Sequence, residues 1–158
     1  GMDFCQPMLD QAEKKKRANS AYKKICFRLG DAMALPLESN STDTITISFG
    51  LRNIANRHQA LCEMYRVLNK SKGTLFILEF SQPFKWFGPF YFFYLRYILP
   101  RIAAICTGDK SAYDYLCGSI EEFPGRDAIS AEILNAGFSK TRAIPLMLGA
   151  VALHVAYA

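Results

Sequence analysis

Apolar residues recur along this chain with two different periods, which predicts alternating helices and strands. Apolar positions at helical spacing predict one helix over residues 7–18 and an amphipathic helix over residues 56–68. A β-branched apolar run at 44–49 predicts a buried strand, and a short strand is expected over 25–29. A second apolar run at 74–80 is hydrophobic almost without interruption, which is typical of a parallel sheet covered on both faces.

The second half of the chain continues this alternation after an apolar, densely aromatic segment at residues 83–106. We expect helices at residues 111–120 and 127–135, followed by two closing strands at residues 140–144 and 148–157. Gly137 follows the last of these helices, where a terminal glycine is common. Strands that alternate with helices indicate an open α/β sheet, built by one domain over residues 1–158.

Composition restricts the classes of function. The 158 residues are 51% hydrophobic and 21% charged, which is ordinary globular composition. The five cysteines are odd in number and form no C-x-x-C pair, so neither a disulfide framework nor a zinc site is expected, and we see no other ligand cluster for a metal. A net charge of +5 favours anionic partners, but no nucleic-acid-binding motif is present. No secretory signal is recognisable.

The aromatic segment between residues 84 and 105 has three interpretations. A transmembrane span is disfavoured because Arg96 and Arg101 interrupt the segment and Pro100 would break the helix. It is otherwise a buried core element, or a lid over a lipid tail or an anchor at a membrane surface. Trp86 and several tyrosines lie close to cations, which suits a membrane interface because their rings are amphipathic.

Residues 31–83 resemble the ubiquinone/menaquinone biosynthesis C-methyltransferase family, and SFGLRN at residues 48–53 is the most diagnostic piece. The stretch SAYDYLCGS at 111–119 and the end GAVALHVAYA are also similar to it. The resemblance implies the class I methyltransferase fold, a Rossmann-like, mostly parallel sheet with a reversed last strand. It also implies S-adenosylmethionine as methyl donor and a polyprenylated quinol as substrate. The expected location is cytoplasmic, peripheral at the inner membrane face, or the matrix side in a mitochondrion.

The sequence departs from the family pattern at its start. Family members carry a first strand, a glycine-rich loop and a helix before the segment that matches residues 1–4, and these are absent here, so we expect a partial domain. The strands expected at 25–29 and 44–49 then lack their shared neighbour, and an open central edge is a liability. Dimer pairing, strand rearrangement or a strand from another chain would each remedy this.

Four residues match cofactor-binding positions of the family. Asp3 would accept hydrogen bonds from the two ribose hydroxyls, and Asp31 with Ala32 would bind adenine. Ser48 would contact the cofactor at the end of a strand. Each polar residue also has a structural interpretation: an acid at a helix start for Asp3, a turn residue for Asp31, and a satisfied core hydroxyl for Ser48.

The substrate side is expected to hold four further residues. Arginine is always protonated, so the resemblance suggests that Arg52 stabilises phenolate charge, with a water taking the proton, while Asn53 orients the ring oxygen. Tyr113 would donate to a quinol oxygen or simply pack. His154 is a candidate proton acceptor because imidazole titrates near neutral pH, but a lone histidine on an apolar strand is more often a core residue.

Two other functions remain open. The chain could be a non-catalytic fragment or scaffold subunit of a quinone-synthesis assembly, which the missing glycine-rich loop favours. A nicotinamide-binding protein fits less well, because no G-x-G-x-x-G motif is present.

Overall fold

The computed structural model describes the backbone of residues 1–101 and 111–158 and the side chains of residues 1–101 and 115–158. Helices and strands alternate along the chain, as the periodicity predicts. In chain order the elements are β1 (Met2–Asp3), α1 (Gln6–Ala18), η1 (Ser20–Tyr22), β2 (Arg28–Leu29), β3 (Thr44–Ser48), η2 (Leu51–Asn53), α2 (Arg57–Val67), β4 (Thr74–Phe80), α3 (Gly88–Phe93), η3 (Tyr94–Ile98), α5 (Ser111–Glu122), α6 (Arg126–Asn135), β5 (Lys140–Leu146), η4 (Met147–Gly149) and β6 (Val151–Tyr157).

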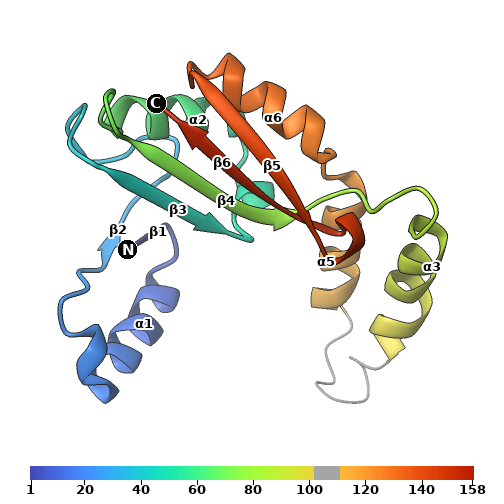
Figure 1. Cartoon of the computed structure of the whole chain (residues 1–158). Helices are drawn as coiled ribbons and strands as arrows, with labels where there is room; N and C mark the ends of the chain where they lie inside the picture. Colours follow the sequence, from blue (N-terminus) through green and yellow to red (C-terminus); the bar gives the residue numbers. More distant parts are fainter. Residues whose placement is uncertain (102–110) are drawn as a thin grey trace.

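The strands form two separate sheets (Figure 1). The larger sheet has the order β3-β4-β6-β5, with β3 and β4 parallel and β6 antiparallel to both of its neighbours. The reversed last strand that we expected is therefore present. The smaller sheet pairs β1 and β2 in parallel. The two strands that sequence analysis left without a shared neighbour, β2 and β3, lie in different sheets.

The main core lies on one face of the larger sheet, under α2 and α6. Leu61 from α2, Ile77 from β4 and Ile133 from α6 are completely buried there. Along β4 the alternate side chains of Phe76 and Leu78 are only half-buried. This differs from the expectation of a sheet covered on both faces, because in the described structure α2 and α6 pack on the same face (Figure 1).

A second, smaller core lies where the carboxyl end of β4 meets α5 and the helix formed by α3 and η3. Leu95 of η3 packs with Cys117 and Ile120 of α5, and Phe80 packs against this group. Within the described residues, no helix has the length and apolar character needed to cross a membrane.

The last predicted strand begins later than expected. Sequence analysis placed it at residues 148–157, but β6 starts at Val151. Met147, Leu148 and Gly149 have φ angles of 47°, 58° and 87°, so the backbone is left-handed there and turns from β5 into β6. The strand expected at 25–29 is also shorter, because β1 pairs only with Arg28 and Leu29.

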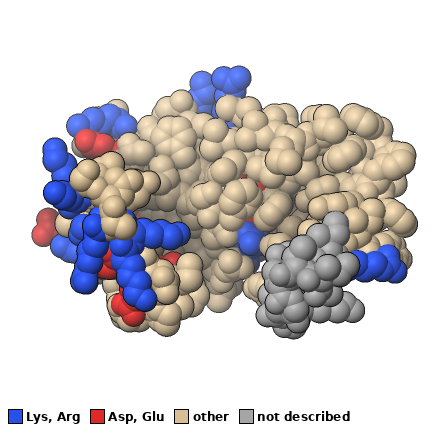
Figure 2. Space-filling view, turned by 90° about the horizontal axis from the view of Figure 1, so that it is seen from below, with Lys and Arg blue, Asp and Glu red and all other residues tan. Residues whose placement is uncertain are grey.

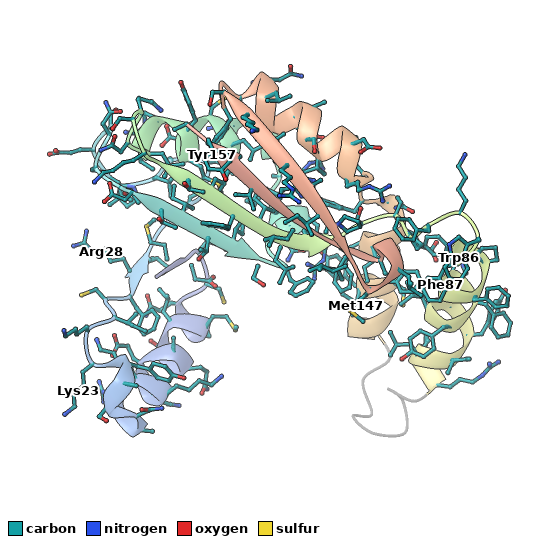
Figure 3. All side chains as sticks on the ribbon, in the orientation of Figure 1. Lys23, Arg28, Trp86, Phe87, Met147 and Tyr157 are labelled. Carbon is teal, nitrogen blue, oxygen red and sulfur yellow. The ribbon has the colours of Figure 1, made fainter. Side chains whose placement is uncertain are left out.

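The two ends of the molecule differ in chemistry. Lys15, Lys16 and Arg17 lie in the last turn of α1, and the densest group of Lys and Arg side chains in Figure 2 is at one end of the molecule. In Figure 3, Lys23 lies at the α1 end, whereas Trp86 and its aromatic neighbours lie at the opposite end.

Candidate functional site

The first candidate site is a cleft of about 790 Å³ between the two sheets. One wall consists of residues 1–4, with Gly30 and Ala32 beyond β2. The other wall is the whole of β3 with the turn that follows it. Because β3 pairs only with β4 among the described strands, its unpaired edge belongs to this cleft. Ligands in open α/β sheets bind where carboxyl ends of parallel strands meet, and this cleft reaches those ends.

Of the four predicted cofactor residues, three line this cleft. They are Asp3, Ala32 and Ser48. Asp3 ends β1 and is half-buried, and its Oδ1 accepts a hydrogen bond from the Cys5 amide at 2.8 Å. Ser48 ends β3 and is exposed. The structure therefore brings together three residues that are far apart in the sequence, and their roles in cofactor binding stay predictions.

Asp31 departs from this prediction. Its side chain is exposed, and its Oδ1 accepts a hydrogen bond from the Met33 amide at 2.8 Å, which stabilises the turn after β2. Its neighbours Gly30 and Ala32 line the cleft, but Asp31 does not. The geometry matches the structural interpretation of a turn aspartate, so adenine recognition by this carboxylate stays a prediction.

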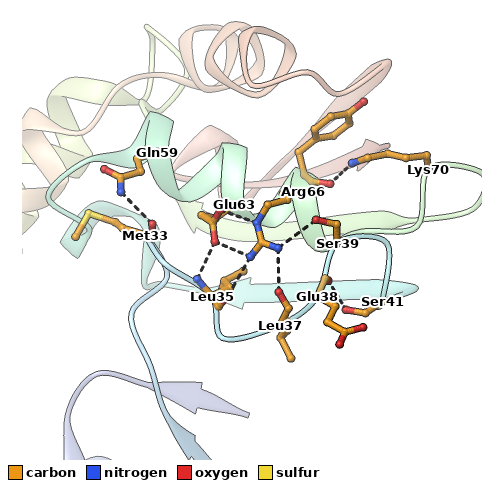
Figure 4. Close-up of polar contacts among 11 residues, drawn as sticks. Met33, Leu35, Leu37, Glu38, Ser39, Ser41, Gln59, Glu63, Arg66 and Lys70 are labelled. Carbon is orange, nitrogen blue, oxygen red and sulfur yellow. Dashed lines mark hydrogen bonds and ion pairs between the residues drawn. The ribbon is translucent and has the colours of Figure 1, made fainter.

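The loop that carries Ala32 is held by α2 (Figure 4). Arg66 donates to the carbonyl oxygens of Leu35 and Leu37 at 3.0 and 2.9 Å, and Glu63 accepts from the Leu35 amide at 2.9 Å. Arg66 and Glu63 also pair directly, and the hydrogen bond from Arg66 lowers the pKa of Glu63. Gln59 donates to the Met33 carbonyl at 3.0 Å. This clamp positions one wall of the cleft.

Arg52 forms an ion pair with Glu79, which sequence analysis did not predict. Nη1 of Arg52 lies 2.9 Å from Oε1 of the buried Glu79 and also donates to the Phe49 carbonyl. The guanidinium stacks over Phe80 with 5.1 Å from its carbon to the ring centroid. Arg52 is not among the residues that line the first cleft, and its predicted role in stabilising a phenolate stays a prediction.

Sequence analysis missed Glu79, whose only signal was an acid inside the apolar run TLFILEF. Its two oxygens accept hydrogen bonds from the Arg52 amide at 3.3 Å and the Phe80 amide at 2.9 Å, besides the guanidinium. A buried carboxylate needs such partners. Together they tie the turn that carries Asn53 to the neighbouring strand β4.

Arg52 instead lines a second cleft of about 390 Å³, together with Arg57, Tyr115, Gly118, Ser119, Glu122 and Phe123. Arg57 forms two hydrogen bonds with Glu132 of α6 at 2.9 and 3.0 Å, which raise the pKa of Arg57. This arginine is therefore a fixed cation at the wall of the second cleft.

Asn53 and Tyr115 link the two clefts. Asn53 lines the first cleft, and its Oδ1 accepts a hydrogen bond from the Tyr115 hydroxyl at 3.3 Å. Tyr115 lines the second cleft and is exposed. Sequence analysis selected Tyr113 instead, whose side chain lies outside the described residues. The periodicity offered no signal to choose between two tyrosines two residues apart.

His154 lines neither cleft. It is buried under α6, and its Nε2–H donates to the Arg126 carbonyl at 3.0 Å, while Nδ1 is buried without a described partner. Burial lowers its pKa, which keeps the imidazole neutral. The structure therefore favours the core interpretation of this residue over the proton acceptor. Among the residues that the structure describes, no cluster of His, Cys, Asp and Glu could hold a metal ion.

Comparison with known proteins identifies the family. The model of the ubiE/COQ5 methyltransferase family matches residues 1–158. The ubiquinone/menaquinone biosynthesis C-methyltransferase UbiE of Ruegeria sp. is 38% identical over 154 residues, covering 97% of this chain and 61% of that protein. The UbiE protein of Rickettsia bellii is 41% identical over 156 residues, covering 98% and 62%. The demethylmenaquinone methyltransferase of Thermus thermophilus is 41% identical, covering 98% and 69%.

Solved structures agree on the fold. A SAM-dependent methyltransferase from Aquifex aeolicus superposes with a TM-score of 0.65 at 16% identity, covering 98% of this chain and 65% of that one. The CurJ carbon methyltransferase gives 0.66 at 16% identity, covering 98% and 40%. The chain thus has the SAM-dependent methyltransferase fold and spans about three-fifths of the length of the UbiE relatives described above. By its match over all 158 residues, this chain belongs to the ubiE/COQ5 methyltransferase family.

Proposed function

We propose that this chain is part of an S-adenosylmethionine-dependent enzyme that methylates a ring carbon of a polyprenylated quinol. The observation that carries the proposal is the cleft that joins Asp3, Ala32, Ser48 and Asn53 at the ends of β1 and β3. The names of relatives about 40% identical supply the reaction and the class of substrate.

The chemistry of the first cleft fits this cofactor. A volume of about 790 Å³ lies within the range of cofactor sites. Asp3 offers carboxylate oxygens, which suit a pair of ribose hydroxyls, and the nearby Phe4 and Ile54 offer apolar surface for a purine. When bound, S-adenosylmethionine supplies an electrophilic methyl carbon on a sulfonium. The residues of this chain hold the cofactor and orient the ring against it.

Asn53 and Tyr115 are the groups that we assign to the ring. Their hydrogen bond at the junction of the two clefts places an amide and a phenol where a quinol oxygen can replace one partner. Loss of the phenolic proton makes the ring carbon nucleophilic. With the cofactor bound, the ring carbon would take the methyl group as the S–CH₃ bond breaks and would then lose its own proton, while the ring oxygen regains one. The products would be the methylated quinol, S-adenosylhomocysteine and one net proton released to solvent.

Arg52 and Glu79 also position the residues of this site. The Glu79 carboxylate holds both the amide and the guanidinium of Arg52, and Asn53 is the next residue. The buried pair therefore fixes the direction in which Asn53 leaves the sheet. Electrostatic catalysis depends on such preorganised groups.

A second candidate function is that of a non-catalytic scaffold. It is favoured by the edge of β3 along the cleft, which no described strand pairs with. We expect this chain alone to bind S-adenosylmethionine weakly, because no glycine-rich backbone is present to approach the carboxypropyl group. Titration calorimetry tests this, and a micromolar dissociation constant would contradict it.

The proposed methyl transfer is tested with a chain extended before Gly1 by the corresponding part of the Rickettsia bellii relative. We expect it to transfer labelled methyl groups to a short-tailed quinol, and Asp3→Asn to weaken cofactor binding about tenfold, as expected when charged hydrogen bonds are lost. Asp10→Asn on α1 is the matched control and should have no effect. If the extended chain binds the cofactor without methylating the quinol, the scaffold function is favoured.

A further inference from the structure

A stripe of aromatic side chains on the outside of α3 and η3 has no role in either cleft. The stripe consists of Trp86, Phe90, Phe93, Tyr94, Tyr97 and Ile98, all of them exposed. Their spacing of three and four residues places them on one face of the helix, with Trp86 in the turn that leads into it. Phe90 is 71% exposed and Trp86 64%, values unusual for such large apolar side chains.

The fold does not need this stripe, because the opposite face of the same helix is packed. Leu95 is buried against Cys117 and Ile120 of α5, and Tyr91 and Leu99 pack against this group. The helix therefore carries apolar side chains on two faces, which is typical of a helix that contacts something on each side.

An ion pair fixes the direction in which the stripe faces. The guanidinium of Arg96 forms two hydrogen bonds with the Glu121 carboxylate of α5, at 2.7 and 2.8 Å. The pair holds η3 against α5, so the aromatic face stays outward. Figure 3 shows Trp86 and Phe87 at the outer end of the molecule, away from Lys23 and Arg28.

The chemistry around the stripe indicates an anionic lipid surface. Residues 83–101 contain no Asp or Glu, while the exposed Lys85 and Arg101 lie near its two ends. Tryptophan and tyrosine prefer the boundary between lipid and water, phenylalanine enters the acyl region, and cations attract anionic headgroups. A contiguous apolar patch of this kind marks an interaction site.

We propose that this stripe binds the surface of an anionic bilayer, with the axis of α3 and η3 lying in the plane of the interface. The choice of a lipid partner over a protein rests on the proposed function, because a polyprenylated quinol resides in a bilayer. The interaction itself requires neither cofactor nor substrate, so it can be tested separately from methyl transfer.

Trp86 makes the test direct, because it is the only tryptophan in the chain. Vesicles of phosphatidylcholine and phosphatidylglycerol without any quinol are added to the protein while tryptophan emission is recorded. We expect the emission to shift to shorter wavelength, brominated acyl chains to quench it, and the protein to float with the vesicles. No shift and no flotation would overturn the proposal, whatever the methyl-transfer assay reports.

Matched variants locate the contact. Phe90→Ser with Phe93→Ser removes two exposed rings from the stripe, and we expect at least about a tenfold loss of vesicle affinity, since each ring loses a favourable burial. Leu134→Ser removes an exposed leucine from α6 and should leave vesicle affinity unchanged. An equal loss in both proteins would contradict the proposal. The proposal would also be contradicted if the wild-type protein did not bind vesicles but formed a dimer, and if the double variant dissociated that dimer.

Discussion

The helices α2 and α3 are both rich in apolar residues, but they use them in opposite ways. In α2 the apolar side chains of Leu61 and Met64 are buried, while its polar face carries the clamp made by Glu63 and Arg66. In α3 the exposed side includes Phe90 and lacks charged residues. The comparison teaches that hydrophobicity alone does not determine burial. A helix with one apolar face buries that face inside the domain. A helix with two apolar faces buries one of them and exposes the other to a binding partner.

The largest expected effect comes from truncating one apolar side chain in each helix and comparing the loss of stability. Leu61→Ala in α2 should lower the free energy of unfolding by about 2–5 kcal/mol, because Leu61 is completely buried and a cavity would remain. Phe93→Ala in α3 should change it by less than about 0.5 kcal/mol, because that ring is exposed. Denaturant titration of both variants measures the difference. Similar losses would mean that α3 is as much a part of the core as α2.

Two Arg–Glu pairs, one buried beside the first cleft and one exposed beside the aromatic helix, give a second test. Glu79→Ala leaves Arg52 without its buried partner and should cost about 3 kcal/mol, toward the lower end for a broken buried pair because Arg52 also lines the second cleft. Glu121→Ala breaks an exposed pair with Arg96 and should cost less than about 1 kcal/mol.

Thermal unfolding with matched buffers measures both variants. Glu79→Gln serves as the conservative control, since an amide keeps part of the hydrogen bonding to the Arg52 turn. A cost for Glu121→Ala that equals or exceeds that of Glu79→Ala would contradict the assignment of Glu79 as the residue that holds this turn.

The smallest expected effect concerns the two histidines. Burial lowers the pKa of His154 in the folded protein, so the unfolded chain binds the proton more readily and stability rises with pH. This contribution is complete above the unfolded pKa of about 6.5 and is lost as the pH falls through the lowered folded value. His154→Gln should flatten the dependence of unfolding temperature on pH between neutral and mildly acidic conditions. His58→Gln, at an exposed position on α2, should not.

Much of the fold was predictable from the sequence, because the spacing of apolar residues in these segments matches the side chains that the structure buries. Residues 74–80 and 44–48 form strands, and residues 57–67 form a helix with Asn56 as its cap, whose side chain accepts from the Gln59 amide. The predictions failed where the backbone takes a conformation that side-chain pattern does not report. The left-handed Met147 and Leu148 follow an apolar pattern that favours a strand.

The candidate site was predictable only in part. The family pattern identified Asp3, Ala32 and Ser48, which the structure places in one cleft. It did not identify Glu79 as the partner of Arg52, because a contact across 27 residues depends on strand register. Nor did it indicate that Tyr115, from a distant helix, reaches Asn53.

The sequence by itself determined which segments become helices and strands and which family the chain resembles, and that resemblance implied the reversed last strand. The helices and strands were predictable because they depend on local period and on residue types at short range. Only the tertiary structure decided that β2 and β3 lie in different sheets, that Arg52 points toward Glu79, and that His154 is enclosed beneath α6. Such outcomes depend on which surfaces pack together, and the balance of burial, charge and hydrogen bonding is settled only when distant segments meet.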